Sequence, residues 1–270
     1  MTIASLPMYD LEPLREATDA WWRSVAASLR RHGFENAPGT LDRGGAVDHY
    51  QHWSSPDLLL SQTCGYPLIR TFADKLRVVA VPLYDAPQCR GAEYCSLVIV
   101  KEDSPARSLA DLRGGRAAIN GFDSQSGCNA FRAAIARLAR DGRFFDEVVE
   151  TGGHELSMRR VAEGGADVCA VDCVTHALLS DTRAEAVAGT RVLTVTPHAP
   201  NLPYVTHIAR SDEEIRAMQM ALLEAAEDPR TAAVRARLRL VGFALLPQKV
   251  YNRIEAMERQ AADLGYPELT

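Results

Sequence analysis

The sequence predicts an α/β protein of two lobes, in which the middle of the chain is inserted into the first lobe. From about Pro105 onward, strand-like and helix-like runs alternate, which is typical of a parallel α/β layer. Residues 191–209, RVLTVTPHAPNLPYVTHIA, contain several prolines and suit an extended return crossing between lobes. We therefore expect lobe 1 to comprise residues 1–98 and 199–270, and lobe 2 to comprise residues 99–198. A length of 270 residues fits one large domain or two such lobes.

Lobe 1 opens with a predicted strand in IASLPMY (residues 3–9), which ends in a proline-containing turn. Residues 13–33 have the apolar spacing of an amphipathic helix that stops at Gly33. Within this helix we expect Trp21 in the core and Trp22 at the surface.

The next part of lobe 1 is predicted to be mostly strands. The segment PDLLLSQTCGYPLI (residues 56–69) predicts a short apolar strand, a polar tip at residues 61–65 and then a turn. Two β-branched runs, residues 76–84 and 94–102, predict further strands. The alternation in the second run indicates that one of its faces is exposed.

Lobe 2 is predicted to consist of successive strand-to-helix units. A helix over residues 126–142 has Gly142 as its C-terminal signal. The chain leaves the lobe through the crossing and continues into helical sequence that begins at residues 211–229. The other predicted elements are a short helix and a strand in residues 108–120, a strand in 144–154, a helix in 155–165, and a strand feeding a helix in 166–179.

The composition is that of an ordinary soluble globular protein, with 24% charged residues, 47% hydrophobic residues and a net charge of −5. Lys and Arg are outnumbered, so no nucleic-acid partner is expected. No window approaches the ~18 consecutive apolar residues of a membrane span, so no membrane insertion is expected.

The six cysteines show no C-x-x-C motif and no zinc-like spacing with the seven histidines. We therefore expect no disulfide framework, no metal and no cofactor. The first residues, MTIASLPMYDLEPL, do not have the pattern of a secretion signal. The expected location is cytoplasmic for the chain as given, or periplasmic if a leader was removed.

Polar residues follow three predicted strands of lobe 2, in NGFDSQSG, ETGGHE and AVDCVTH. In a parallel layer, such junctions gather at the carboxyl ends of the strands, where ligands ordinarily bind. The helix that begins near Ser126 adds free N–H groups and the positive end of its dipole, which favour a phosphate-like or carboxylate group. Gly127 leaves room for the backbone to approach such a group. The side chains expected to converge are Ser124, Gln125, Ser126, His154 and Asp172.

Lobe 1 is expected to contribute its polar tip to the same cleft. There, Thr63, Cys64 and Tyr66 would present a hydroxyl, backbone N–H groups and an aromatic wall. Tyr9, at the end of the first strand, and Tyr94, at the start of the strand before the crossing, are further candidates.

Each of these residues also has a purely structural interpretation. Ser124 or Ser126 would serve as a plain helix N-cap, since serine is a preferred cap in any helix. His154 would cap the following helix or lie at the surface, Asp172 would bond a local turn, and the tyrosines would simply pack. The occurrence of all three polar groups at the same kind of junction favours a shared site.

Several of these segments resemble the phosphate, phosphite and phosphonate binding proteins of ABC importers, which have the type 2 periplasmic-binding-protein fold. The resemblance rests on DSQSGCNAFR and ETGGHELSMRRVAEGGADVCAVDCVTHALL, and less specifically on LLLSQTCGYPL and NLPYVTH. It extends roughly from Ile3 to Gly242. It implies two α/β lobes that close on the ligand about a hinge of two crossing strands.

The resemblance also implies that the residues gripping the phosphonate oxygens are Ser124, Gln125, Ser126 and His154. Gln125 stands where Thr or Ser is usual in the family, so an amide replaces a hydroxyl at this position. Asp172 is the one carboxylate that matches, weakly, the amine-binding carboxylates of the aminophosphonate binders.

We therefore expect a solute-binding protein for a small phosphonate- or phosphate-like anion, with ABC-importer membrane components as candidate partners. Two other classes stay open. One is a cytoplasmic enzyme on the same scaffold, acting on a small anionic metabolite with Cys64 and His154 as nucleophile and base, which is the less favoured reading. The other is a ligand sensor that reports to a partner protein.

Overall fold

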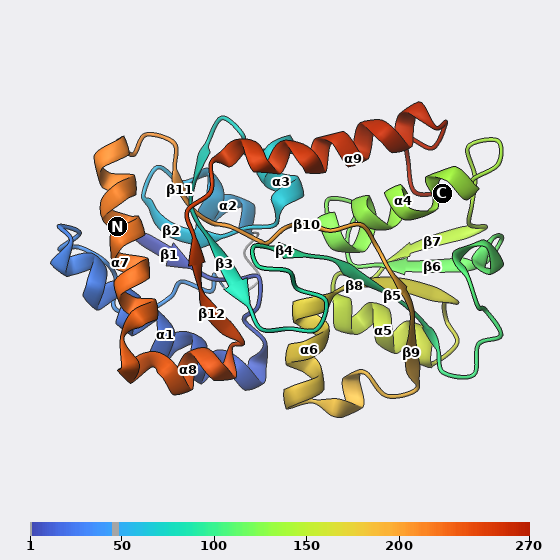
Figure 1. Cartoon of the computed structure of the whole chain (residues 1–270), viewed down its shortest axis with the longest axis horizontal. Coiled ribbons are helices and arrows are strands. Elements are labelled where there is room, and N and C mark those ends of the chain that lie inside the picture. The colour runs from blue at the N-terminus through green and yellow to red at the C-terminus, as the bar shows by residue number, and fades with distance from the viewer. Residues whose placement is uncertain (1, 45–48) are drawn as a thin grey trace. The chain divides into compact units, whose positions relative to one another are not determined.

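The computed structural model describes residues 2–44 and 49–270 (Figure 1). The described residues form two compact units, each built around one five-stranded sheet. Unit 1 comprises the described residues up to Asp85 together with Pro200–Val250, and unit 2 comprises Ala86–Ala199 and Tyr251–Thr270.

The predicted lobes differ from these units at residues 86–98, at Ala199 and at residues 251–270, all of which lie in unit 2. Two contacts explain the difference. The strand at Ser96–Lys101 pairs with strands of unit 2, and the helix at Asn252–Asp263 packs against the helix at Ala130–Ile135.

The sheet of unit 1 has the strand order β1-β2-β11-β3-β12. β1 and β2 are parallel, and β11 runs antiparallel to both β2 and β3. The carboxyl ends of β1, β2 and β3 therefore lie at the same edge of this sheet. The strands are β1 (Ile3–Ser5), β2 (Leu58–Gln62), β3 (Leu76–Tyr84), β11 (Tyr204–His207) and β12 (Leu240–Ala244). The helices are α1 (Arg15–Arg31), α2 (His49–Ser54), α3 (Gly65–Arg70), α7 (Asp212–Glu227) and α8 (Ala232–Arg237).

The predicted amphipathic helix is confirmed as α1, which a 3-10 turn at Glu12–Leu14 precedes. The prediction that Trp22 lies at the surface is wrong, because its side chain is only 1% exposed. The chain after α1 folds back over the indole, whose Nε1 donates a hydrogen bond to the Pro38 carbonyl at 3.0 Å. The turn predicted after the polar tip is instead the short helix α3.

The sheet of unit 2 has the strand order β7-β6-β8-β5-β9, and Figure 1 shows α4 and α5 on opposite sides of it. β6 is parallel to β7 and β8, whereas β5 runs antiparallel to β8 and β9. The layer is therefore mixed rather than purely parallel. The strands are β5 (Ser96–Lys101), β6 (Arg116–Ile119), β7 (Glu147–Glu150), β8 (Val168–Asp172) and β9 (Thr190–Val195), with a separate pair of β4 (Glu93–Tyr94) and β10 (Ala199–Pro200). The helices are α4 (Ala130–Ile135), α5 (His154–Ala162), α6 (Cys173–Thr182) and α9 (Asn252–Asp263).

Two predictions for unit 2 are wrong in detail. β5 has no exposed face, since all its residues except Lys101 are buried between two neighbouring strands and the covering helices. The helix predicted over residues 126–142 is much shorter, because α4 ends at Ile135 and a 3-10 turn follows. Gly142 has φ 74° and lies in the turn between Arg140 and Arg143, not at the end of a long helix.

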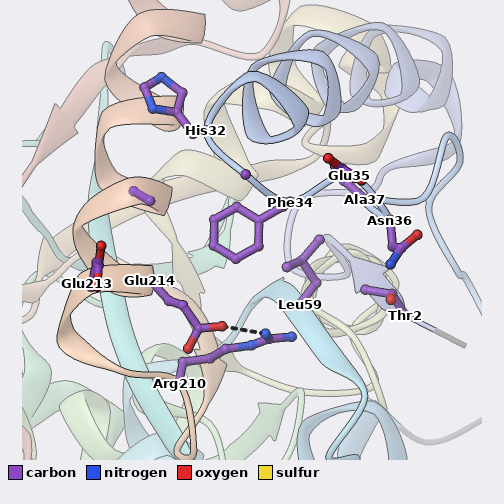
Figure 2. Close-up of a pocket in the computed structure, with 12 residues that line it drawn as sticks. Thr2, His32, Phe34, Glu35, Asn36, Ala37, Leu59, Arg210, Glu213 and Glu214 are labelled. Carbon is purple, nitrogen blue, oxygen red and sulfur yellow. Dashed lines mark hydrogen bonds and ion pairs between the residues drawn. The ribbon is translucent and has the colours of Figure 1, made fainter.

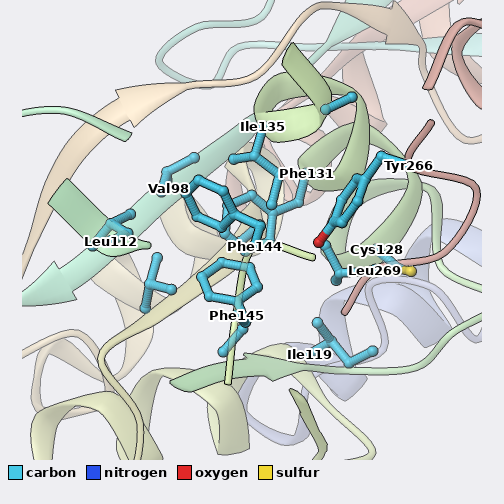
Figure 3. Close-up of a cluster of buried hydrophobic side chains, with 14 of the residues drawn as sticks. Val98, Leu112, Ile119, Cys128, Phe131, Ile135, Phe144, Phe145, Tyr266 and Leu269 are labelled. Carbon is cyan, nitrogen blue, oxygen red and sulfur yellow. The ribbon is translucent and has the colours of Figure 1, made fainter. Parts of the chain in front are cut away.

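The core of unit 2 is an aromatic cluster between β5, β6 and α4 (Figure 3). The Phe144 and Phe145 rings meet edge to face with their centroids 4.8 Å apart. The end of the chain packs into this cluster, because Tyr266 and Leu269 are buried in it. The Thr270 carbonyl accepts hydrogen bonds from the backbone of both phenylalanines at 2.8 and 3.0 Å and from the Tyr266 hydroxyl at 2.6 Å. The last residues are therefore part of the core of unit 2.

None of the helices within residues 2–44 and 49–270 combines the length and the apolar character that crossing a bilayer requires.

The junction between β6 and α4 is a π-helical turn, Gln125–Asn129, a rare geometry that is frequently found at functional sites. Ser124 caps this turn, because its Oγ accepts a hydrogen bond from the Gly127 backbone N–H at 3.0 Å. The turn lies directly against the end of β6. A Cβ atom placed on Gly127 would be 1.8 Å from Asn120 Oδ1 and 3.0 Å from its Cγ. Only glycine fits at this position without displacing Asn120.

Replacing Gly127 with alanine is expected to lower the free energy of unfolding by about 1–3 kcal/mol, the usual cost of overpacking a buried position. The added methyl group would force the partly buried Asn120 side chain away from the turn. Urea denaturation of both proteins would measure the difference. Gly242→Ala is the matched control, since no atom of the described residues lies within 4 Å of its added Cβ. Equal losses in the two variants would contradict this account.

Candidate functional site

Polar side chains gather at the carboxyl edge of the parallel strands in unit 2. Ser124 and Ser126 follow β6, and His154 follows β7. Parallel pairing sets Ile119 opposite Glu150, so the chain leaves both strands at the same level. The two junctions, far apart in sequence, are therefore neighbours in the fold.

A chain of three side chains connects these junctions. The Ser126 Oγ and the His154 Nε2 are 2.9 Å apart, within hydrogen-bonding distance. The Ser124 Oγ lies 3.4 Å from the Ser126 Oγ. Both serines are nearly buried, with 6% and 5% of their surface exposed. The structure therefore brings together the two hydroxyls and the imidazole that the sequence singles out.

The backbone around these hydroxyls is held firmly. The Ser124 carbonyl accepts from the backbone N–H groups of Cys128 and Asn129, at 3.3 and 3.0 Å, within the π-helical turn. The Ser126 carbonyl accepts from the Ser96 hydroxyl at 2.8 Å. The Gly127 N–H donates to the Ser124 Oγ, so the amides of this turn hold its own backbone and the Ser124 side chain in place.

His154 is the first residue of α5, and Gly153 is its N-cap. Desolvation lowers the pKa of His154 to about 4, and the nearby Ala170 backbone opposes this only in part. The ring Nδ1 is buried and has no hydrogen-bond partner within the described part of the chain. The imidazole is therefore neutral near pH 7, and its Nε2 accepts the Ser126 hydroxyl proton or donates in the other tautomer.

Gln125 is held by other side chains of unit 2. Its side chain is fully buried, its Nε2 donates to the Met257 Sδ at 3.4 Å, and its Oε1 accepts from the Asn129 Nδ2 at 2.7 Å. The first contact joins the amide to α9, and the second joins it to the end of its own turn. The Asn129 amide also donates to the Ile254 carbonyl of α9 at 3.1 Å, which anchors this arrangement.

Asp172 ends β8, at the same edge of the sheet, and acts as the N-cap of α6. Its Oδ1 accepts from the backbone of Val174 and Thr175 at 2.7 and 2.9 Å. The Asp172 carboxylate therefore has the structural role of a helix cap. Tyr94, which lies in β4 two residues before β5, is 2% exposed.

Two residues that support the site were not predicted. Asn120 ends the strand segment and makes the close approach to Gly127, and Ser96 holds the Ser126 carbonyl. Asn120 lies in the quoted motif NGFDSQSG and follows the same rule of polar residues at strand ends. Ser96 begins an antiparallel strand, so this rule does not find it.

The candidates from unit 1 lie at the corresponding edge of its own sheet. Tyr9 packs edge to face against Tyr84 with ring centroids 5.2 Å apart, and the Gln62 amide donates to the Tyr84 hydroxyl at 3.1 Å. These three residues line a small cavity of about 30 Å³, enough for about one water molecule. Gln62 and Tyr84 end β2 and β3 but were not among the predicted residues.

The residues of the polar tip after β2 make local contacts at the start of α3. Thr63 is buried, and its hydroxyl donates to the Cys64 carbonyl at 3.2 Å. Cys64 is the N-cap position of α3, and Tyr66 lies in the first turn of that helix, half-buried.

A larger pocket of about 460 Å³ lies in unit 1 beside α7 and contains none of the predicted site residues (Figure 2). Its charges are unsuited to an anion. The Arg210 guanidinium is paired with Glu214 at 2.7 Å, and His32 is paired with Glu224 at 2.8 Å. Glu35 and Glu213 add further negative charge. Within residues 2–44 and 49–270, no group of three or more His, Cys, Asp or Glu side chains has the geometry to hold a metal ion.

Solved structures with the same fold include several solute-binding proteins. A binding protein component of an ABC phosphonate transporter from Pseudomonas aeruginosa, PA3383, aligns with a TM-score of 0.75 at 16% identity over 97% of this chain and 87% of that one. PhnD1 from Prochlorococcus marinus, solved in complex with methylphosphonate, aligns with a TM-score of 0.75 at 14% identity over 97% and 98%. XAC2383 from Xanthomonas citri, bound to chloride ion, aligns with a TM-score of 0.70 at 15% identity over 97% and 98%. At these identities the likeness shows the fold alone.

No curated protein matches the sequence. A family model described as "ABC transporter, phosphonate, periplasmic substrate-binding protein" matches residues 56–251, well over half of the chain. The matched region includes both junctions that carry the serines and the histidine. The chain therefore belongs to the family of periplasmic substrate-binding proteins of phosphonate ABC transporters.

Proposed function

We propose that this protein binds a small phosphonate- or phosphate-like anion at the strand edge of unit 2, through Ser124, Ser126 and His154. The observation that carries the proposal is the 2.9 Å contact between the Ser126 hydroxyl and the His154 imidazole, with the Ser124 hydroxyl beside it. The family of the chain and the methylphosphonate in the complex of PhnD1 from Prochlorococcus marinus support the choice of ligand.

The three side chains suit a tetrahedral oxyanion because each can turn a donor toward it. In the absence of ligand, the Ser126 hydroxyl is satisfied by the His154 Nε2. When an anion binds, the hydroxyl rotates to donate to an oxygen, and the imidazole donates from Nε2 in its other tautomer. Hydrogen bonds to a charged acceptor are stronger than those between neutral groups, so this exchange favours binding.

The sequence supplies further candidate contacts from unit 1. Under this proposal, Tyr9, Thr63, Cys64 and Tyr66 contact the same ligand when a hinge motion closes the two units on it. The neutral aromatic surfaces would face the organic substituent of a phosphonate, while the donors of unit 2 hold its oxygens.

We also propose that the protein delivers its ligand to the membrane components of an ABC importer rather than transforming it. The family consists of substrate-binding components, which supports binding over catalysis. Desolvation lowers the pKa of His154, so its imidazole is a weaker base than an exposed one for removing the proton of a thiol. The family is periplasmic, and we propose the same compartment for this protein.

Replacing Ser126 with alanine is expected to weaken methylphosphonate binding about ten- to a hundredfold, because a hydrogen bond to a charged group contributes about 1.5–3 kcal/mol. Isothermal titration calorimetry of the wild-type protein with methylphosphonate, phosphite and phosphate would establish the ligand first. Ser180→Ala is the matched control, since Ser180 is exposed on α6 and bonds only within that helix. Unchanged affinity in Ser126→Ala, or no binding of any of these anions to wild type, would contradict the proposal.

The stability of the unliganded protein is expected to fall as the pH is lowered from about 6.5 to about 4. His154 has an ordinary pKa of 6.5 in the unfolded chain and a pKa lowered to about 4 in the folded one. Between these values, the unfolded chain binds a proton that the native state does not, so the loss is about 2–3 kcal/mol and is confined to this range.

Urea denaturation of wild type and His154→Gln at steps between about pH 7 and about pH 4 would measure this loss. The variant lacks the titrating group, so its free energy of unfolding is expected to fall less over this range. Desolvation also lowers the pKa of His176, which contributes equally to both proteins and cancels in the comparison. Identical pH dependence in the two proteins would show that His154 is not neutral and desolvated in the native state.

A further inference from the structure

Three cysteines that are far apart in the sequence meet in unit 2. Cys89 lies in the turn before β4, Cys95 lies directly before β5, and Cys173 is the first residue of α6. The sulfur atoms of Cys89 and Cys173 are 3.7 Å apart. The backbone N–H of Cys173 donates to the Cys95 carbonyl at 3.1 Å. None of the six cysteines, all of which lie in the described ranges, forms a disulfide.

We propose that Cys89 and Cys173 form a redox-active thiol pair that is oxidised to an intramolecular disulfide by a small disulfide such as glutathione disulfide. This site goes beyond the proposed function and does not depend on it. The composition and spacing of the cysteines do not reveal it, because the pairing joins residues in two separate motifs.

The structure holds Cys89 in place above Cys173. Residues 86–89 form a β-turn, in which the Cys89 N–H donates to the Ala86 carbonyl at 3.0 Å and Pro87 occupies the second position. Gln88 adopts φ 74°, a conformation that this turn requires at its third position and that residues other than glycine adopt at a cost. The Gln88 carbonyl lies 2.9 Å from the His198 Nε2, which secures the turn from a second segment.

The next residues extend this restraint. Arg90 and Glu93 exchange two backbone hydrogen bonds, at 2.9 and 3.2 Å, around a tight hairpin. Cys89 thus lies between two turns of defined geometry, and little conformational freedom is lost when its sulfur is bonded.

Cys89 and Cys173 differ in their exposure to solvent and in the pKa of their thiols. Cys173 is 1% exposed and lies at the start of a ten-residue helix, whereas Cys89 is half-buried in an exposed turn. Hydrogen bonds from the Cys89 and Cys95 thiols lower the pKa of Cys173, and the same contact with Cys173 raises the pKa of Cys89. The helix N-terminus and His198 also favour the Cys173 thiolate. A solute therefore reaches Cys89 first, and of the two thiols Cys173 loses its proton more readily.

The reaction proceeds by two exchange steps. The Cys89 thiol passes its proton to the Cys173 thiolate, and the Cys89 sulfur attacks one sulfur of glutathione disulfide, releasing one glutathione thiolate. Cys173 then gives up the proton to that thiolate, and its sulfur attacks the Cys89 sulfur of the mixed disulfide. This second step forms the Cys89–Cys173 bond and releases the second glutathione. Two electrons pass from the Cys89 thiol and the Cys173 thiolate to glutathione disulfide. The one proton, which comes from Cys89, ends on the first glutathione, and the second glutathione leaves as a thiolate that water protonates.

The test equilibrates the full, folded chain with buffers of fixed ratios of reduced glutathione and glutathione disulfide, and then blocks the remaining thiols with iodoacetamide. Peptide mapping without reduction is expected to show the peptide that contains Cys89 joined to the peptide that contains Cys173. Formation of this species should rise with the share of glutathione disulfide. Because a cross-link restricts the unfolded chain, the oxidised protein should also melt at a higher temperature than the reduced one.

Three variants sharpen the test. Cys89→Ser should abolish the cross-link and the rise in melting temperature, while Cys64→Ser, in unit 1, should leave both unchanged. In Cys95→Ser the same cross-link should still form. A mixed glutathione adduct on Cys89 that never resolves, a linkage that involves Cys95, or full alkylation of Cys89 and Cys173 after equilibration would each overturn the proposal. Peptide mapping of the wild-type protein decides the matter even where a variant fails to fold.

Discussion

The hydrogen bond between the Ser126 hydroxyl and the His154 imidazole joins two turns that lie 28 residues apart in the sequence. It forms because β6 and β7 are parallel neighbours, so the chain leaves both strands at one edge of the sheet. The Ser96 hydroxyl adds a contact from β5, which runs the opposite way and therefore starts where the other two end. The site is thus a consequence of strand order and direction, and each loop contributes only one or two groups.

Much of this arrangement can be predicted from the sequence, because it depends on patterns within short stretches of the chain. The alternation of apolar strands and amphipathic helices sets the layer, and polar residues after each strand mark the edge where ligands bind. Ser124, Ser126 and His154 follow from these two rules together with the family resemblance. The same rules place Asp172 at the edge, where it serves as the cap of α6.

The parts that the sequence does not reveal depend on segments distant in the chain. The direction of Gln125 is decided by Met257 of α9, more than a hundred residues later, and by a π-helical turn that no simple periodicity predicts. The alternation in residues 94–102 indicates an exposed face, but both faces of β5 are buried because α4 and α5 pack against it from opposite sides of the sheet. Trp22 is covered by the loop after its own helix. In each case tertiary packing overrides the local pattern.

The Thr270 carbonyl accepts from the backbone of Phe144 and Phe145, so unit 2 joins residues 86–199 to residues 251–270, which are synthesised much later. During translation, the aromatic cluster of unit 2 must wait, incompletely covered, until α9 and the tail have left the ribosome. All residues of unit 1 are by contrast synthesised once Val250 has been added. Nascent unit 2 therefore leaves its phenylalanine rings incompletely covered for longer than unit 1 leaves its own core.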